Sequence, residues 1–186
     1  MHAPPHDRLS EAEFLALPET TRRVELVDGE VLVAPAPSAL HQEVLRRLVR
    51  ELERGLAAAE PNVTLLFAPT DVRFGDRRIL QPDVALWRRS LALPATGPIT
   101  TVPDVCVEIL SNDRAYDRTT RRAIYADAGV PEYWVVELYG PLELWTGERL
   151  SHSQTFHDRI VSVAIPGLEI DLARVFLAAG DRGADD

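Results

Sequence analysis

Three carboxylic acids stand inside apolar segments of the sequence, where a charged side chain is out of place. Glu25 lies within VELV, Asp83 directly precedes VALW, and Glu108 lies within VCVEIL. A buried carboxylate is costly unless it is paired or bound to a metal. Mg²⁺ in proteins commonly binds one or two carboxylates together with water and substrate phosphate. The three acids therefore predict a site for Mg²⁺ or Mn²⁺, where the cation would neutralise a phosphodiester and help to form hydroxide from water.

An ordinary structural role is the alternative for each of these acids. An acid at the end of a strand often faces solvent or caps a turn, and both Asp83 and Asp104 follow prolines at such ends. Glu108 fits this alternative less well, because it comes late in the most apolar predicted strand. Alternation along that strand places Asp104, Cys106 and Glu108 on one face and apolar residues on the other. Glu108 thus shares its face with a small residue, which leaves room for a ligand.

Turn and capping signals indicate the N-terminal elements. Residues 24–27 and 30–33 are extended runs joined by Asp28-Gly29, which predicts a hairpin with a type I′ turn. Ser38 is the expected N-cap of a long helix, because leucine and valine recur after it at helical spacing over about five turns.

The later elements follow from apolar runs and from residues that end helices. Extended runs are predicted at 63–67, 71–74, 79–87, 102–110, 133–138, 142–146 and 159–165. The run at 79–87 is interrupted by Pro82. A helix capped within 111–113 is expected to run to about Ala128, where Gly129 ends it, and a last short helix follows Asp171. This order predicts an α+β (mixed α/β) fold with a mixed central sheet flanked by helices, an N-terminal hairpin and extra C-terminal strands.

The composition is that of a globular protein with one domain. The chain has 186 residues, of which 46% are hydrophobic and 26% charged, enough to bury a substantial core. We expect one domain over 9–177 between flexible tails at 1–8 and 178–186. The sequence has neither the apolar length of a membrane span nor the apolar core of a signal peptide, which predicts a cytoplasmic protein. The single cysteine, Cys106, excludes an internal disulfide.

The charge argues against a general nucleic-acid binder. The net charge is −9 and the pI about 5.0, whereas such proteins are usually basic. Contact with DNA therefore requires a local arginine-lined patch or the groove of an oligomer. All 20 basic residues are arginine, so no lysine is available for catalysis.

Five blocks of the sequence occur in an order that is typical of a known family. They are LSEAEFLALPETTRRVELVDGEVLVAPAPSALHQEVLRRL, QPDVALW, PDVCVEILSND, DRTTRRAIYADAGVPEYWVVE and IPGLEIDLARVF. From about residue 9 to about residue 176 the chain resembles the Uma-two family of restriction-endonuclease-like proteins, in the PD-(D/E)XK nuclease superfamily. The resemblance implies a restriction-endonuclease-like core that cleaves DNA phosphodiester bonds with Mg²⁺ or Mn²⁺. It implies Asp83 and Glu108 as the catalytic, metal-binding pair. It further implies Glu25 as a catalytic residue, with His41 and Tyr125 at the border of the site.

The chain departs from the superfamily motif at its lysine. The motif places a lysine two residues after the glutamate, where this chain has Leu110. In the Uma-two family the lysine lies in the next helix, in a segment resembling DRGEKxxxY, and Arg121 occupies its position here. Arginine stays charged and cannot act as a base, but it can hold a phosphate oxygen or steady an attacking hydroxide. Asp117 and Arg121 are four residues apart on a helix, and a surface ion pair is the alternative for them.

The resemblance leaves the function open between three classes. The expected function is a metal-dependent endodeoxyribonuclease. A catalytically weakened nucleic-acid-binding or regulatory module on the same fold is the alternative, and a hydrolase that uses paired carboxylates on another substrate is the third. For His41, in the first turn of its helix, the sequence favours a capping or partly buried histidine over a metal ligand. We expect a homodimer, because cleavage of two strands and a composite basic groove both require one.

Overall fold

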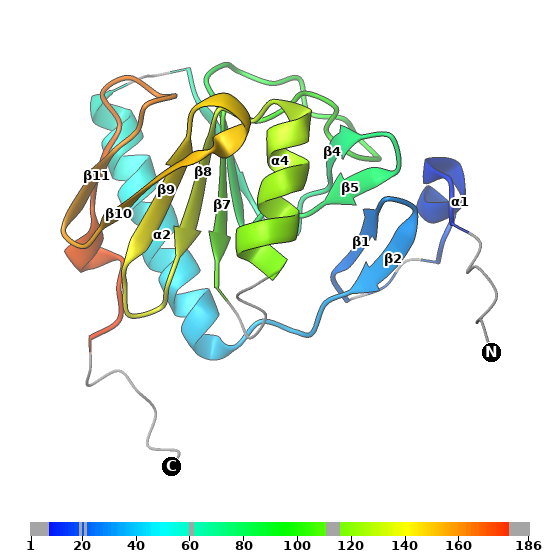
Figure 1. The fold of residues 1–186 in the computed structure, drawn as a ribbon, viewed down its shortest axis with the longest axis horizontal. Helices are drawn as coiled ribbons and strands as arrows, with labels where there is room; N and C mark the ends of the chain where they lie inside the picture. Colours follow the sequence, from blue (N-terminus) through cyan, green and yellow to red (C-terminus); the bar gives the residue numbers. More distant parts are fainter. Residues whose placement is uncertain (1–7, 19, 21, 60–61, 111–115, 179–186) are drawn as a thin grey trace, which may run out of the picture.

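The computed structural model describes residues 8–18, 20, 22–59, 62–110 and 116–178. Its centre is a six-stranded sheet in the order β10-β9-β8-β7-β6-β3 (Figure 1). The strands are β3 (Thr64–Phe67), β6 (Val84–Trp87), β7 (Val105–Ile109), β8 (Glu132–Val136), β9 (Leu142–Thr146) and β10 (His152–Phe156). β7 and β8 are parallel, and the other neighbours are antiparallel. The mixed central sheet of the predicted α+β fold is therefore confirmed.

A second sheet, in the order β2-β1-β5-β4, lies beside the first and contains the N-terminal hairpin (Figure 1). Its strands are β1 (Val24–Val27), β2 (Glu30–Val33), β4 (Val72–Gly75) and β5 (Arg78–Leu80). The hairpin turn has a positive φ at both Asp28 (51°) and Gly29 (87°), as the predicted type I′ turn requires. A short helix, α1 (Glu11–Leu15), precedes this sheet.

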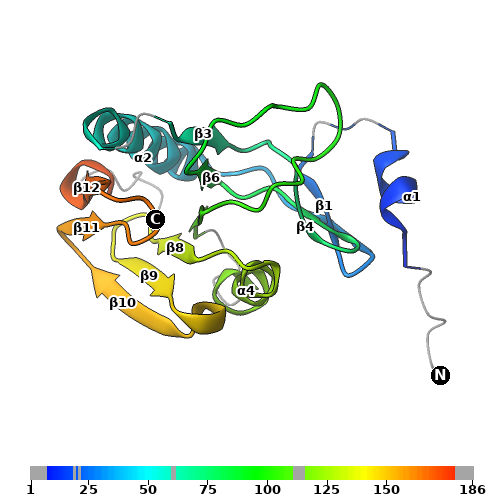
Figure 2. The ribbon, with the colours of Figure 1, turned by 90° about the horizontal axis from the view of Figure 1, so that it is seen from above.

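Helices cover both faces of the six-stranded sheet (Figure 2). On one face lies α2 (Ala39–Ala58), which is capped by Ser38 as predicted. On the other lie the π-helix η1 (Asp117–Arg121) and α4 (Arg122–Ala128). Every second side chain of β7 joins the leucines of α2 in one core, and the alternate ones face the α4 side. The alternation predicted for this strand is confirmed, and it places Glu108 on the α4 side.

The C-terminal part consists of η2 (Glu148–Leu150), β11 (Arg159–Val161), β12 (Glu169–Asp171) and η3 (Leu172–Arg174). β12 and η3 pack against α2, whereas η2 packs against α4. β11 and β12 form a two-stranded antiparallel sheet. A Cβ atom at Gly55 would lie 2.8 Å from the carbonyl oxygen of Glu169. This close approach explains why glycine, which weakens a helix, stands inside α2.

The structure corrects several of the predicted elements. The single run predicted at 79–87 is two strands in different sheets, β5 and β6, because Pro82 cannot donate a ladder hydrogen bond. The sequence does not predict β10, because HSQTF is largely polar and exposed and shows no apolar alternation. The run predicted at 159–165 ends at Val161, and the last short helix is one 3-10 turn.

Some predictions concern residues outside the described ranges. The start of the helix expected at 111–113 lies outside them, as do the two tails apart from Arg8 and Ala178. The division into one domain and two flexible tails stays a prediction. Within the part of the chain that is described, no helix combines the length and the apolar character needed to cross a bilayer.

Glu132, at the start of β8, anchors the turn that follows β11. Its side chain is fully buried, and it accepts hydrogen bonds from Trp134 Nε1 and from the backbone amides of Val163 (2.7 Å) and Ala164 (2.6 Å). We expect Glu132→Ala to lower the free energy of unfolding by about 3 kcal/mol, because these donors lose their acceptor inside the protein. Urea denaturation measures the loss. The control Glu143→Ala, at a partly exposed glutamate in β9, should cost about 1 kcal/mol at most, and equal losses would contradict the anchoring role.

Candidate active site

The three carboxylates singled out in the sequence meet where the two sheets adjoin. Glu25 lies on β1, Asp83 in the link between β5 and β6, and Glu108 on β7, and each is 2% exposed. The break at Pro82 lets Asp83 turn toward the end of β7. There its Oδ2 accepts a hydrogen bond from the backbone amide of Ile109 at 2.8 Å. Segments far apart in the chain thus bring three acids into one buried cluster.

Arg121 joins the cluster through all three guanidinium nitrogens. Nη2 lies 2.6 Å from Glu25 Oε2, Nη1 lies 3.0 Å from Glu108 Oε1, and Nε lies 3.1 Å from Asp117 Oδ1. Its side chain is 6% exposed, so the alternative of a surface ion pair with Asp117 is wrong. Burial opposes the charge, but the carboxylates of Glu108 and Glu25 outweigh it and hold the pKa of Arg121 well above its usual value. Arg121 and Asp117 both lie in the π-helix η1. π-helical turns are rare and often occur at functional sites.

Arg23 is a second guanidinium in the cluster, and sequence reasoning missed it. Its Nη2 lies 3.2 Å from Glu25 Oε1, its Nη1 lies 3.0 Å from Asp83 Oδ1, and its Nη2 lies 3.7 Å from Glu108 Oε2. Nη2 also donates to the carbonyl oxygen of Gln81. Arg23 is one of two adjacent arginines before β1, and only the fold shows which of the two turns inward.

His41, in the first turn of α2, contacts Asp83. Its Nε2 lies 3.1 Å from Asp83 Oδ2, and the histidine is 6% exposed. Burial opposes ionisation of Asp83, but the hydrogen bond with His41 and the charge of Arg23 hold the pKa of Asp83 below its usual value. His41 is therefore a buried histidine, as the sequence favours, and it also lies at the border of the cluster.

Glu108 has a strongly perturbed acidity. Burial and the nearby charge of Asp83 together raise its pKa to about 8, although the charge of Arg121 acts in the opposite direction. The hydroxyl of Tyr125 donates a hydrogen bond to Glu108 Oε1. Glu108 therefore carries a proton at neutral pH in the metal-free protein, and a metal has to displace that proton in order to bind.

Comparison with known proteins identifies the family. Residues 11–173 match the model of the Uma2 family, which is described as a putative restriction endonuclease family. The chain belongs to the Uma2 family. A crystal structure of a putative nuclease belonging to DUF820 from Anabaena variabilis ATCC 29413 has the same fold, with a TM-score of 0.71 and 18% sequence identity over 90% of this chain and 97% of that one. None of the curated proteins matches this Uma2 chain.

In this Uma2 protein an apolar side chain lies two residues after Glu108 in the sequence. Leu110, two residues after Glu108, is 3% exposed and packs in the same apolar cluster as Ile124 and Tyr125 of α4. The cation that contacts Glu108 from the protein interior is Arg121, which comes from η1. A positive charge thus reaches the glutamate from a helix, while the strand position contributes to the core.

The candidate donor atoms of the Uma2 site are carboxylate oxygens, which are the type of ligand that binds a hard divalent cation. Asp83 and Glu108 present carboxylate oxygens, the ligands that Mg²⁺ and Mn²⁺ prefer. Among the described residues, no three His, Cys, Asp or Glu side chains are arranged as a metal site. Mg²⁺ needs only one or two protein carboxylates, and Glu108 Oε2 lies 3.7 Å from Arg23, too far for a hydrogen bond. The residues therefore fit the metal, provided that Arg23 gives up its contact with Asp83.

The raised pKa of Glu108 predicts how stability depends on pH. The native protein keeps the Glu108 proton up to about pH 8, whereas the usual pKa of the group is 4.5. The native state therefore binds more protons between these values, and the contribution of Glu108 to the free energy of unfolding falls as the pH rises through this window. Glu108→Gln cannot ionise and should remove this fall. Urea unfolding of both proteins in chelator, from about pH 5 to about pH 9, measures it, and parallel curves would contradict a protonated Glu108.

Proposed function

We propose that this Uma2 protein is a metal-dependent endonuclease that hydrolyses the phosphodiester bonds of DNA. The observation that carries the proposal is the buried cluster in which Glu25, Asp83 and Glu108 converge on two arginines. Buried ion pairs are weak evidence for stability, whereas strongly perturbed carboxylates are typical of functional sites. The family description and the nuclease fold of the solved relative support the same chemistry.

Asp83 and Glu108 would hold the metal, and their neighbours keep them in place. A bound Mg²⁺ or Mn²⁺ would neutralise charge on the phosphodiester and lower the pKa of a water molecule. His41 and the amide of Ile109 orient the Asp83 carboxylate. Tyr125 orients Glu108 from the side of α4. The two ligands are thus positioned before any metal arrives, which limits the reorganisation that binding requires.

Arg121 takes the place of the family lysine with a narrower role. A guanidinium stays charged, so Arg121 does not take a proton from water. It holds Glu25 and Glu108 and adds positive charge beside the reacting phosphate, which stabilises negative charge in the transition state. Glu25 bridges the two arginines of the cluster through its two oxygens, and we assign it to their positioning.

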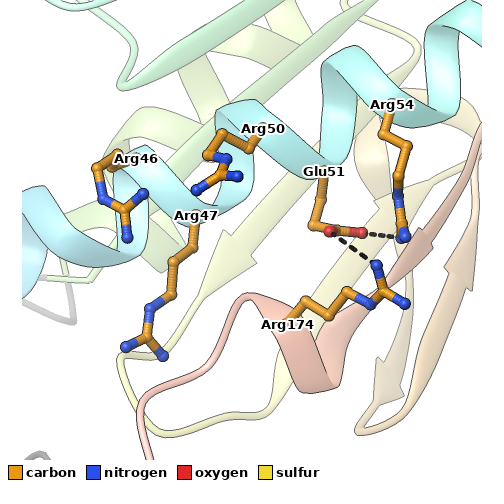
Figure 3. A pocket seen from close by; sticks show the side chains of 6 residues that line it. All are labelled: Arg46, Arg47, Arg50, Glu51, Arg54 and Arg174. Carbon is orange, nitrogen blue, oxygen red and sulfur yellow. Dashed lines mark hydrogen bonds and ion pairs between the residues drawn. The ribbon is translucent and has the colours of Figure 1, made fainter.

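An arginine-rich face offers a place for DNA in a chain whose net charge is −9. On the outer side of α2, a cavity of about 520 Å³ is lined by Arg46, Arg47, Arg50, Glu51, Arg54 and Arg174 (Figure 3). Glu51 pairs there with Arg54 and Arg174, and Glu43 pairs with Arg46 and Arg47. The Glu43 carboxylate is partly exposed, and such surface pairs are worth little, so DNA phosphates can replace it at Arg46 and Arg47 at small cost, whereas Glu51 is buried. This face supports DNA as the partner, and its helix begins at the site with His41.

Cleavage of DNA tests the proposal directly. Purified protein is incubated with supercoiled plasmid and with short duplex and single-stranded DNA, in Mg²⁺, Mn²⁺ or chelator. We expect cleavage with either metal and none in chelator, and Asp83→Ala should be inactive. Cleavage in chelator would refute the metal dependence, and full activity of Asp83→Ala would refute the assignment of the site.

A catalytically weakened nucleic-acid-binding or regulatory module is the second candidate. The observation that favours it is that the chain contains no lysine, and both cations in the cluster are arginines, which do not transfer protons. Metal binding in calorimetry without cleavage of any DNA would favour this candidate over the first. The homodimer and the cytoplasmic location stay predictions.

A further inference from the structure

Arg23 occupies the space that the three carboxylates share. Its guanidinium lies 3.0 Å from Asp83, 3.2 Å from Glu25 and 3.7 Å from Glu108. Asp83 and Glu108 are the two members of the proposed metal-binding pair, and Arg23 contacts both of them. A single positive charge thus stands between the oxygens that a divalent cation would need.

Arg23 is also the group of the cluster that is nearest to solvent. Its side chain is 21% exposed, compared with 3% for each of the carboxylates Glu25, Asp83 and Glu108 and 6% for Arg121. It precedes β1 and belongs to no strand or helix. A long, flexible side chain at this position can swing toward water while its backbone stays in place.

We propose that Arg23 is a displaceable counter-ion of the metal site, which pairs with Asp83 and lies beside Glu108 in the metal-free protein and leaves both when the metal binds. The inference rests on the proposed function, because it takes these two residues as the metal ligands. The physical reason is repulsion: a divalent cation bound to the same oxygens would lie a few ångströms from the guanidinium, where like charges repel strongly in a buried site. Arg23 therefore lowers metal affinity and sets how much free metal the site requires.

Once displaced from the carboxylates, the Arg23 side chain is placed to bind a substrate phosphate. Arg23 lies on the solvent side of the carboxylates, where a substrate phosphate would approach the metal. The guanidinium fork matches phosphate oxygens in geometry. Arg23 thus exchanges a carboxylate partner for a phosphate partner, and Arg121, which is more deeply buried, stays with Glu25 and Glu108.

Metal binding without DNA tests this inference. Calorimetry with Mn²⁺ is carried out on wild type, Arg23→Gln and Arg23→Lys, with Arg22→Gln as the matched control at the adjacent, exposed arginine. We expect Arg23→Gln to bind Mn²⁺ at least about tenfold more tightly than wild type, because a charge has been removed from the carboxylates. Arg23→Lys keeps the charge and should stay within about threefold of wild type, and Arg22→Gln should not differ from it. Mn²⁺ should also raise the Tm of Arg23→Gln more than that of wild type.

The outcomes separate this inference from the proposed function. Unchanged or weaker Mn²⁺ binding by Arg23→Gln, with metal-dependent DNA cleavage by wild type, would overturn the counter-ion role and leave the nuclease intact. Equal tightening in Arg23→Gln and Arg23→Lys would also overturn it, because the charge would then be irrelevant. Absence of Mn²⁺ binding in every variant, together with absence of cleavage, would overturn the metal site itself. Circular dichroism establishes that each variant is folded, and Arg23→Met, which is also neutral, carries the comparison of charge if Arg23→Gln is not folded.

Discussion

Glu108→Gln is expected to abolish DNA cleavage and leave the protein folded. The neutral amide has nearly the shape of the protonated carboxyl that the native protein holds at neutral pH, where the pKa of Glu108 is about 8. The substitution should therefore change the free energy of unfolding little at neutral pH. The metal, however, loses an anionic ligand that no neighbour replaces. We expect cleavage to fall on the order of a thousandfold or more, since metal catalysis is worth several kcal/mol and each 1.4 kcal/mol is about tenfold in rate.

Plasmid nicking in Mn²⁺ measures the loss of cleavage, and urea unfolding of the same preparations measures the stability of the fold. Glu143→Gln is the matched control, because Glu143 lies in β9 and pairs with Arg118 outside the cluster. It should keep the cleavage rate of wild type. A Glu108→Gln protein that cleaves at the rate of the control would show that Glu108 is not a metal ligand. One that is inactive but also unfolded would contradict the protonated state assigned to Glu108.

Arg121→Ala is expected to destabilise the protein by about 3–5 kcal/mol, because it leaves buried acids without their counter-ion. The three nitrogens of Arg121 contact Glu25, Glu108 and Asp117 at 2.6, 3.0 and 3.1 Å. A lysine has one nitrogen and cannot reach all three acids at once. Arg121→Lys should therefore recover only part of the loss. A lysine at position 121 should thus weaken the cluster around it.

Arg118→Ala is the matched control on the same helix. Arg118 also pairs with two glutamates, Glu137 and Glu143, but its side chain is 27% exposed. We expect its removal to cost about 1 kcal/mol at most. Thermal and urea unfolding of both variants at low salt compare the two arginines. A loss for Arg121→Ala as small as that for Arg118→Ala would mean that water screens the cluster and that its charges are not buried as a unit.

The charge of the cluster links these expectations. Two guanidinium groups supply the positive charge that the buried carboxylates contact. Arg121 is buried and held by three acids, so it is a permanent part of the site. Arg23 is nearer to solvent and contacts both proposed metal ligands, so it is the exchangeable part. This division follows from burial, because the side chain of Arg23 is 21% exposed and that of Arg121 is 6% exposed.

The sequence by itself determined the local elements and the acids that form the buried cluster. Asp28-Gly29 specifies the hairpin turn because only certain residues accept a positive φ at both positions. Ser38 specifies the start of α2 because its side chain accepts a hydrogen bond from the helix amides. Asp83 and Glu108 stand out because a carboxylate buried in an apolar segment is costly unless it is paired or bound to a metal. Each of these signals lies within a few residues of its effect, so each can be read without a fold.

Only the tertiary structure decided which charges meet. Nothing near Arg23 in the sequence distinguishes it from Arg22, yet Arg23 reaches Asp83 across the two sheets. Pro82 appears in the sequence as an interruption of one strand, but in the fold it separates two sheets and aims Asp83 at β7. The physical reason is the sequence separation of the interacting residues. Turns, caps and alternation depend on neighbours in the chain, whereas the partner of a buried charge depends on which distant strands pair. The composition of the candidate metal site, two acids with two arginines, is therefore a property of the fold.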